Sequence, residues 1–374
     1  MYFKMSRIDL LNMITIASKA ISSNSPLPSL LGIKFDVKND HIELTASDSD
    51  ISIKTMKSKN EEGVFEVYEE GCIVINKNYI NDIIRKIDSD VVEIEIIDGS
   101  LTKISGNTSE FKINGIKSNE YPLIDFNKPA KSFTISSTLL KNIINQTYFA
   151  TSSQETRPAL TGINFSCDGS SMTCIATDSY RLSRKVVEIN NDLKFNITIP
   201  AKSLLEVARL LDKEEDVEVA ITDKKAQFIC NNTIIQTRLI DGSYPDTSRF
   251  IPNNYDYSLV MNIKDLVHAI DRQSFIKNEN DLFCILKLSM NENEIVISSR
   301  SQEIGSSKEN LYYDSYEGKP LELSFSGKYV SDALKGLNGE KVKIQFCGEM
   351  KPFILTSLED ETTLQLVLPV RTFS

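Results

Sequence analysis

The stretch Ile175-Ala-Thr-Asp-Ser-Tyr-Arg-Leu-Ser183 holds the pattern around which the rest of the chain is organised. Its first residues end an apolar strand, and the short polar side chains at 177–179 favour a turn. A similar stretch, Thr45-Ala-Ser-Asp-Ser-Asp-Ile51, stands 130 residues earlier. A weaker copy, Ser299-Arg-Ser-Gln-Glu-Ile304, follows about as far on the other side. This spacing indicates one module used three times.

Other features recur at the same interval. Each third opens with a short strand, starting at 3, 133 or 259, which leads into an amphipathic helix ending near Ser22, Ala150 or Ile276. A lysine at 77, 202 or 328 precedes a second expected helix in each third: Tyr79–Ile87, Leu204–Leu211 and Tyr329–Leu337. Between the helices, apolar and polar residues alternate as in antiparallel strands with one buried face.

These elements predict an α+β fold of three modules, at 1–128, 129–253 and 254–374. In each module two helices are expected to pack on one side of a curved antiparallel sheet. Each third ends at a proline, at position 122, 245 or 369, which cannot donate to a sheet ladder. Three copies of one module form either a solenoid or part of a closed ring.

The composition argues against several functional classes. The 374 residues contain only two histidines, His41 and His268, in different modules, which disfavours a histidine metal site or a catalytic triad. There is no glycine-rich phosphate loop in the sequence. No apolar run reaches the ~18 residues of a membrane span. We therefore expect a non-catalytic cytoplasmic protein without cofactor or metal.

The net charge of −10 is unusual for a protein that binds nucleic acid. The expected helices, however, carry a small positive excess, so the acidic residues lie mainly in strands and loops. If all helices face one way, that face is mildly basic. Such a face would attract duplex DNA weakly and without reading its bases, which allows sliding. Lys202, Arg209 and Lys328 are the candidate residues for this face.

Six segments, in order along the chain, carry a family resemblance. They are Pro26-Leu-Pro-Ser-Leu-Leu-Gly32, Arg157-Pro-Ala-Leu-Thr-Gly-Ile-Asn-Phe165, Ala176-Thr-Asp-Ser-Tyr-Arg-Leu182, Asp241-Gly-Ser-Tyr-Pro-Asp246 with Arg249-Phe-Ile-Pro252, Ala269-Ile-Asp-Arg-Gln-Ser-Phe275 and Leu368-Pro-Val-Arg371. Over essentially its whole length the chain resembles the bacterial DNA polymerase III beta subunits, the sliding clamps. The resemblance implies a head-to-tail dimeric ring around duplex DNA, with helices lining the pore. It also implies three protein partners: the alpha subunit of the replicative polymerase, the clamp loader and other proteins with clamp-binding peptides.

The resemblance also assigns residues to sites. The partner-binding pocket would comprise Leu160, Thr177, Ser179, Tyr180, Arg181, Leu182, Pro245, Arg249, Phe250, Leu368, Pro369, Val370 and Arg371. Apolar walls would take a partner's Leu or Phe side chain, and the arginines its polar backbone or terminus. Asn24 and Gln154 would join Lys202, Arg209 and Lys328 in facing DNA. At the dimer interface, Phe111 and Ile113 would pack against Phe275 and Ile276.

Several positions differ from the family pattern, among them Asn24, which stands where some members carry Arg, and Pro158-Ala159, where some carry aromatic residues that touch DNA. Ser179 stands where the family commonly has Gly, so a positive φ there would carry a cost. Tyr180 replaces the usual His at the rim of the pocket. The tail Thr372-Phe-Ser374 runs past the family motif, and Phe373 is expected to cover part of the pocket.

The sequence is also compatible with two other functions. One is a scaffold that gathers partners through the same pocket without binding DNA, and the mass in solution separates it from a ring clamp, which must be a dimer. The other is a hydrolase that uses a pair such as Asp178 and Ser179, for which the sequence shows neither a base nor an oxyanion signature.

Overall fold

The computed structural model describes residues 1–189, 192–211, 214–277 and 283–371. The chain divides into two compact units. Unit 1 consists of Met1–Leu139 and Lys202–Leu239, and unit 2 of Leu140–Ala201 and Ile240–Ser374. Each unit therefore combines one terminal third of the chain with part of the middle third.

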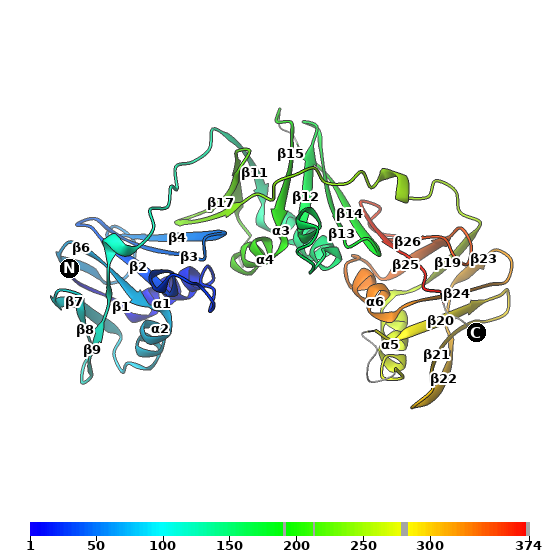
Figure 1. Ribbon diagram of the computed structural model, residues 1–374, viewed down its shortest axis with the longest axis horizontal. Coiled ribbons are helices and arrows are strands. Elements are labelled where there is room, and N and C mark those ends of the chain that lie inside the picture. The colour runs from blue at the N-terminus through cyan, green and yellow to red at the C-terminus, as the bar shows by residue number, and fades with distance from the viewer. Residues whose placement is uncertain (190–191, 212–213, 278–282, 372–374) are drawn as a thin grey trace. The chain divides into compact units, whose positions relative to one another are not determined.

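Unit 1 contains two antiparallel sheets (Figure 1). The five-stranded sheet has the order β5-β1-β7-β8-β9, and the nine-stranded sheet has the order β10-β6-β2-β3-β4-β18-β17-β16-β11. The strands of the smaller sheet are β1 (Tyr2–Ser6), β5 (Phe65–Glu69), β7 (Val91–Asp98), β8 (Leu101–Ser105) and β9 (Glu110–Asn114). Those of the larger sheet are β2 (Gly32–Val37), β3 (His41–Ser47), β4 (Ile51–Ser58), β6 (Gly71–Asn76), β10 (Ile116–Lys117), β11 (Lys131–Ser136), β16 (Asp216–Ile221), β17 (Lys225–Cys230) and β18 (Thr233–Arg238).

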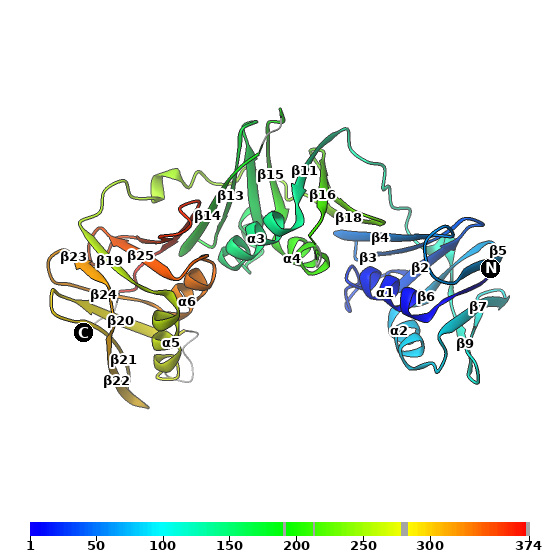
Figure 2. The ribbon, with the colours of Figure 1, turned by 180° about the vertical axis from the view of Figure 1, so that it is seen from behind.

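The helices of unit 1 are α1 (Arg7–Ser18), α2 (Lys77–Lys86) and α4 (Ala201–Leu210). They lie on one side of the nine-stranded sheet, as Figures 1 and 2 show from opposite directions. In α1, Leu10, Met13, Ile14 and Ala17 follow helical spacing, and all four are buried. At the start of α2, Asn76 Oδ1 accepts a hydrogen bond from the Asn78 N–H at 3.0 Å, a regular N-terminal cap.

Unit 2 repeats this plan with one nine-stranded and one four-stranded antiparallel sheet. The orders are β15-β12-β13-β14-β27-β26-β25-β19-β23 and β22-β21-β20-β24. The strands of the larger sheet are β12 (Gly162–Cys167), β13 (Ser171–Thr177), β14 (Arg181–Glu188), β15 (Phe195–Pro200), β19 (Tyr257–Asn262), β23 (Ser315–Glu317), β25 (Lys341–Phe346), β26 (Phe353–Ser357) and β27 (Thr363–Val367). Those of the smaller sheet are β20 (Ile285–Met290), β21 (Ile295–Ser301), β22 (Gly305–Leu311) and β24 (Leu321–Ser326).

The helices of unit 2 are α3 (Ser137–Thr147), whose first turn belongs to unit 1, α5 (Ile263–Gln273) and α6 (Gly327–Lys335). Asn262 caps the start of α5, where its Oδ1 accepts from the Lys264 N–H at 2.9 Å. Helix α6 packs against β24 and β27, and its buried face includes Val330, Ala333 and Leu334. Single 3₁₀ turns, such as η4 (Pro158–Thr161), lead into several strands.

The predicted fold class is confirmed, because each third of the chain supplies two helices that pack on antiparallel strands. One detail of the prediction is wrong. The sheets are not confined to single thirds, since β4 pairs with β18 and β14 pairs with β27. Pairing across the thirds hydrogen-bonds strand edges that would otherwise be exposed.

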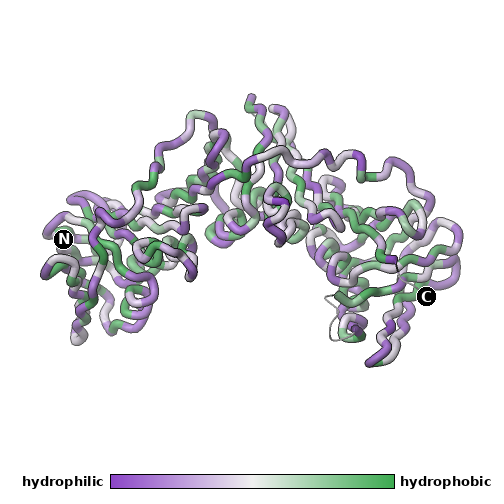
Figure 3. Tube along the Cα trace, in the orientation of Figure 1, coloured by the Kyte–Doolittle hydropathy of each residue, from purple (hydrophilic) through white to green (hydrophobic). Residues whose placement is uncertain are grey.

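Hydrophobic segments lie mainly inside each unit, and the connecting loops are mostly hydrophilic (Figure 3). The core of the last third, for example, gathers Leu259, Leu286, Phe325 and Phe346 from both sheets and Leu334 from α6. Over the described part of the chain, every helix is too short or too polar to serve as a membrane span.

Candidate functional site

The stretch that dominates the sequence forms a tight turn between β13 and β14. Thr177 Oγ1 donates to the Arg181 carbonyl at 2.6 Å and accepts from the Ser179 N–H at 3.1 Å. Asp178 Oδ1 accepts from the N–H groups of Tyr180 and Arg181 at 2.9 and 3.0 Å. Ser179 has φ +79°, so the residue that replaces glycine does adopt the left-handed conformation.

The same turn occurs in the first third. Ser47 Oγ donates to the Ile51 carbonyl at 3.0 Å, and Asp48 Oδ1 accepts from the N–H groups of Asp50 and Ile51. Ser49 has φ +84°. In the last third, Ser301 Oγ accepts from two following N–H groups at 3.2 Å, a related but looser arrangement. The repetition predicted from the sequence is therefore present in the backbone geometry.

Arg181 is held within its own unit. Its side chain is only 9% exposed, and its guanidinium donates from Nε to Asp178 Oδ2 at 3.0 Å and from Nη1 to Asp332 Oδ2 at 2.7 Å. The guanidinium also lies over the Tyr329 ring, 4.4 Å from its centroid. Two carboxylates thus already neutralise Arg181, and these contacts position the turn against α6. That Arg181 also contacts a partner stays a prediction.

Beside this turn, unit 2 contains a cavity of about 520 Å³. Nine of the expected pocket residues line it: Leu160, Thr177, Ser179, Tyr180, Arg181, Leu182, Pro245, Phe250 and Leu368. The lining is mainly apolar, and Tyr180 and Phe250 are exposed at its edge. Because a large apolar cavity with a few polar groups suits a short peptide or small ligand, this is the candidate binding site.

Four expected residues are not among those that line the cavity: Arg249, Pro369, Val370 and Arg371. The Arg249 side chain is 87% exposed and lies 3.6 Å from Asp246. The Val370 N–H donates to the Ser324 carbonyl at 2.7 Å, which directs the chain beyond Leu368 along the smaller sheet. The final residues, 372–374, including Phe373, lie outside the described residues.

Six further residues line the cavity without having been expected there: Arg157, Pro158, Ala159, Asp241, Pro352 and Leu366. Leu366 could have been found from the period-two alternation with Leu368. Pro352 could not, because only the pairing of β26 with β27 brings it there. Arg157 Nη1 donates to Ser179 Oγ at 3.3 Å and places a positive charge at the rim.

The arrangement lacks the parts of a hydrolytic site. The Asp178 carboxylate accepts from two backbone N–H groups and from Arg181, and Ser179 Oγ accepts from Arg157. In the part of the chain that the structure describes, neither group forms a hydrogen bond with a histidine. Among the described residues, no cluster of His, Cys, Asp and Glu could hold a metal ion. The Asp–Ser pair thus builds the turn.

The candidate DNA-facing residues are all at or near the surface of their units. Asn24 and Gln154 lie in exposed loops, and Lys202 is exposed near the start of α4. Arg209 forms an ion pair with Glu206, and Lys328 Nζ lies 3.0 Å from Asp332 Oδ2. Two of these three cations therefore have an acidic neighbour on their own helix.

The four residues expected at a dimer interface differ in exposure. Phe111 and Ile113 lie on β9, the last strand of the five-stranded sheet. Phe275 is 68% exposed just beyond α5, whereas Ile276 is only 7% exposed. Ile276 is thus already buried within its own unit, and its part in a dimer interface stays a prediction.

Taken together, the fold and the cavity define a binding protein built from three related modules. Three family models match the chain in order: the N-terminal domain of the DNA polymerase III beta subunit at residues 1–125, its central domain at 134–246 and its C-terminal domain at 248–371. The chain therefore belongs to the DNA polymerase III beta subunit family, the bacterial sliding clamps. Members of this family are processivity factors of the polymerase and not catalytic enzymes.

Individual relatives agree with this assignment. The beta sliding clamp of Bacillus subtilis (strain 168) is 39% identical over 379 residues and is covered completely, as is this chain. The beta sliding clamp of Staphylococcus epidermidis is 37% identical, again over both full lengths. The crystal structure of the Bacillus subtilis sliding clamp matches with a TM-score of 0.96 at 38% identity, covering 100% of both chains. The beta chain from Streptococcus pneumoniae matches with a TM-score of 0.95 at 31% identity, covering 99% of this chain and 100% of that one.

Proposed function

We propose that two copies of this chain close head to tail into a ring around duplex DNA in the cytoplasm. The ring, opened and loaded by a clamp loader, tethers the alpha subunit of the replicative polymerase and other proteins through the pocket of unit 2. The observation that carries the proposal is this apolar cavity beside the Thr177–Arg181 turn, on a chain whose whole length matches the clamp family.

Ring closure is supported by two exposed sheet edges. Strand β9 ends the five-stranded sheet of unit 1, and β22 ends the four-stranded sheet of unit 2. Each edge carries an exposed aromatic neighbour: Phe111 on β9, and Phe275 after α5, which packs against β22. Unpaired edges with apolar side chains favour association, so β9 of one copy would pair with β22 of the other.

DNA binding is supported by the charge on the helices. The six helices found among the described residues contain eleven Lys or Arg and six Asp or Glu residues, a net charge of +5 within a chain of −10. The rest of the chain therefore carries −15. A diffuse cationic helix surface attracts phosphates without base contacts, which suits a protein that slides along any sequence.

Partner binding follows from the chemistry of the cavity. Leu160, Leu182, Leu366 and Leu368 offer apolar surface to a Leu or Phe side chain of an extended peptide. Arg157 at the rim is exposed and could meet the backbone or an acidic group of that peptide. The affinity should be modest, because a short peptide buries little area and must be ordered on binding.

The experiment that tests the proposal is retention on DNA after loading with a clamp loader. The protein should stay on nicked circular DNA and leave the same DNA within minutes of its linearisation, because a ring slides off free ends. Equal retention on both forms would show site-specific binding instead of encirclement. Failure to bind circular DNA at all, with a normal loader control, would favour a scaffold that does not bind DNA.

A further inference from the structure

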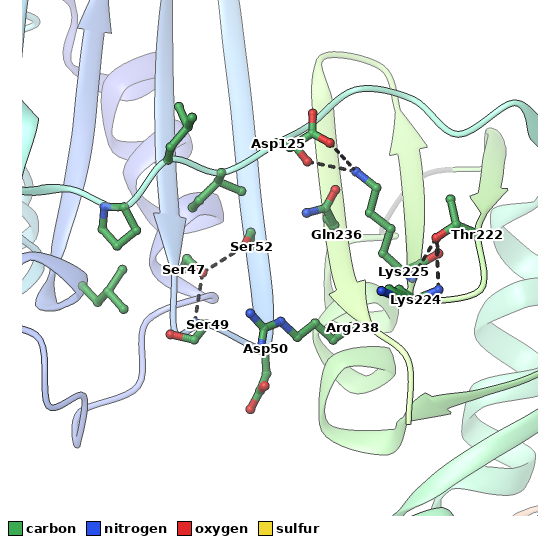
Figure 4. Close-up of a pocket in the computed structure, with 14 residues that line it drawn as sticks. Ser47, Ser49, Asp50, Ser52, Asp125, Thr222, Lys224, Lys225, Gln236 and Arg238 are labelled. Atoms are coloured by element: carbon green, nitrogen blue, oxygen red, sulfur yellow. Dashed lines mark hydrogen bonds and ion pairs between the residues drawn. The ribbon is translucent and has the colours of Figure 1, made fainter. Parts of the chain in front are cut away.

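Unit 1 contains a second cavity, of about 500 Å³, beside the junction of the paired strands β4 and β18 (Figure 4). The residues around it come from the Ser47–Ile51 turn, from the segment after Tyr121 and from the β16–β17–β18 strands. They are Leu30, Ser47, Ser49, Asp50, Ser52, Pro122, Leu123, Ile124, Asp125, Thr222, Lys224, Lys225, Gln236 and Arg238.

The second cavity occupies the same place in unit 1 as the peptide pocket does in unit 2. Ile51 on β4 pairs with Thr237 on β18, and Arg181 on β14 pairs with Val367 on β27. Each residue of the first pair lies 130 positions before its counterpart in the second pair, because 181 − 51 and 367 − 237 are both 130. The next bond also matches: the Arg238 N–H donates to the Asp50 carbonyl at 3.0 Å, and the Leu368 N–H donates to the Tyr180 carbonyl at 2.9 Å.

The equivalent positions differ sharply in chemistry. The pair Leu182 and Leu366 in unit 2 corresponds to Ser52 and Gln236 in unit 1. In the same way, Leu368 corresponds to Arg238. Phe353 pairs with Val367 in unit 2 as Ala226 pairs with Thr237 in unit 1. Pro352, the residue before Phe353, therefore corresponds to Lys225, the residue before Ala226. Three leucines and a proline that line the apolar pocket of unit 2 thus correspond to polar or cationic residues in unit 1, on strands that pair in the same register.

Two cations of the second cavity are available to a ligand. Within the described part of the chain, neither the Arg238 guanidinium nor the Lys224 ammonium has an ion pair or side-chain hydrogen bond. Figure 4 shows the Arg238 side chain extending toward the Ser47–Ile51 turn. Lys225, in contrast, is held by the Asp125 carbonyl at 3.0 Å and by Asp125 Oδ2 at 3.2 Å.

The cavity also keeps an apolar part. Leu30, at the position equivalent to Leu160, lines the cavity and is buried, and Ile124 is partly buried. Leu123 is fully exposed and also lines the cavity, so it offers further apolar surface to an occupant. An occupant that combines one apolar side chain with adjacent carboxylates would cover this leucine and pair with Arg238 and Lys224.

We propose that this cavity is a second peptide-binding site, which takes an extended acidic segment carrying one Leu-like side chain. The positive charges of Arg238 and Lys224 favour an acidic ligand. The strands around the cavity pair in the same register as those around the pocket of unit 2, so the backbone suits an extended peptide in both places. The inference goes beyond the proposed ring function and does not depend on it, because the site lies within one unit of a single chain.

The test measures the binding of two fluorescein-labelled peptides by anisotropy at low salt. One is Asp-Glu-Leu-Glu-Asp, blocked at both ends, and the other is its neutral counterpart Asn-Gln-Leu-Gln-Asn. The acidic peptide should bind at least about tenfold more tightly, because each charge-assisted hydrogen bond contributes about a factor of ten. Equal binding of both peptides would overturn the proposal.

Substitutions locate the site. Arg238→Glu and Lys224→Glu should each weaken the acidic peptide by about tenfold, and Arg238→Gln by less. The matched control is Lys59→Glu, which reverses the charge of an exposed lysine in the same unit outside the cavity. An equal loss with Lys59→Glu would show unspecific attraction. Loss of the acidic peptide with Leu368→Asp, but not with Arg238→Glu, would place it in the pocket of unit 2 and overturn the proposal.

Competition separates this peptide from other anions. A short DNA duplex at the same charge concentration should displace the acidic peptide less effectively than unlabelled acidic peptide does. Stronger displacement by the duplex would identify the cavity as a phosphate-binding surface and contradict the proposal. Thermal unfolding of each variant shows whether a loss of binding reflects a loss of fold.

Discussion

Arg181 on β14 donates from Nη1 to Asp332 Oδ2 on α6 at 2.7 Å, although 151 residues separate the two in sequence. The contact joins the turn that the sequence repeats to a helix of the last third. Both side chains lie largely out of solvent. The fold thus gives Arg181 a second carboxylate, that of Asp332, in addition to the carboxylate of Asp178 in its own turn.

Arg181→Ala should destabilise the protein strongly, by about 3 kcal/mol, because it leaves the poorly solvated Asp178 carboxylate without a cation, while Asp332 keeps the more exposed Lys328. Urea unfolding monitored by circular dichroism measures the loss. Arg249→Ala is the matched control, since that arginine is exposed and its ion pair is weak. Similar midpoints for the two variants would contradict a structural role for Arg181.

Ser179→Gly should stabilise unit 2 by up to about 1 kcal/mol, because glycine adopts a positive φ without the strain of a Cβ atom. Ser49→Gly should act in the same direction, since that turn has the same conformation. Differential scanning calorimetry of both variants checks the sign. A lower melting temperature for Ser179→Gly would mean that the hydrogen bond from Arg157 outweighs the strain.

The ion pair between Lys185 and Asp360 should make stability depend on pH in the acid range. Burial raises the pKa of the Asp360 carboxyl, but hydrogen bonds from Thr362 and Lys185 outweigh it and lower that pKa to about 2. Because the folded-state pKa is depressed, the stabilisation is fully present above the unfolded pKa of about 4 and is lost as pH falls toward 2.

Asp360→Asn removes this titrating group. At pH 6 the variant should be less stable than the unsubstituted chain by about 2 kcal/mol, and the difference should shrink as the pH approaches 2. Urea midpoints at pH 6, 4 and 3 make the comparison. A difference that does not vary with pH would show that Asp360 contributes through packing and not through its charge.

Phe275→Ala should convert the proposed dimer to monomer with little change in the fold of the chain. Phe275 is exposed in one copy, so its truncation removes contact area only at the proposed interface, at a cost of about 3 kcal/mol there. Sedimentation equilibrium measures the mass. Phe111→Ala on the opposite edge should have the same effect, and a dimer that survives both substitutions would rule out this interface.

Ile276→Ala serves as the contrasting variant. Its side chain is buried in its own unit, so the substitution should lower the unfolding temperature of the chain itself. A double variant at 275 and 276 would mix the two effects, and the single substitutions keep them apart.

Replacing Lys202, Arg209 and Lys328 with Glu should weaken association with DNA while the chain stays folded, because these side chains are at the surface of their helices. Each phosphate contact that is lost should reduce the slope of log K against log salt by about 0.9. Titration of duplex DNA at several salt concentrations measures both effects. Unchanged loading and slope would show that the positive charge on the helices has no role in DNA binding.

The sequence alone determined the repeated module and most of its elements. The interval of 130 between Thr45–Ile51 and the corresponding stretch ending at Arg181 predicted the same turn twice, and the hydrogen bonds of both turns agree. Local rules suffice here, because turns, caps and helix faces depend on residues close in sequence. Nine of the residues assigned to the pocket by resemblance also line one cavity.

Only the tertiary structure decided which strands of different thirds pair and what that pairing does to side chains. The β14–β27 pairing brings Leu366 and Pro352 to the pocket, and the fold neutralises Arg181 with Asp332 and buries Ile276. The β4–β18 pairing likewise creates a second cavity whose wall carries Arg238. Such features depend on long-range register and on the burial of each side chain, which hydrophobic periodicity within a single segment does not specify.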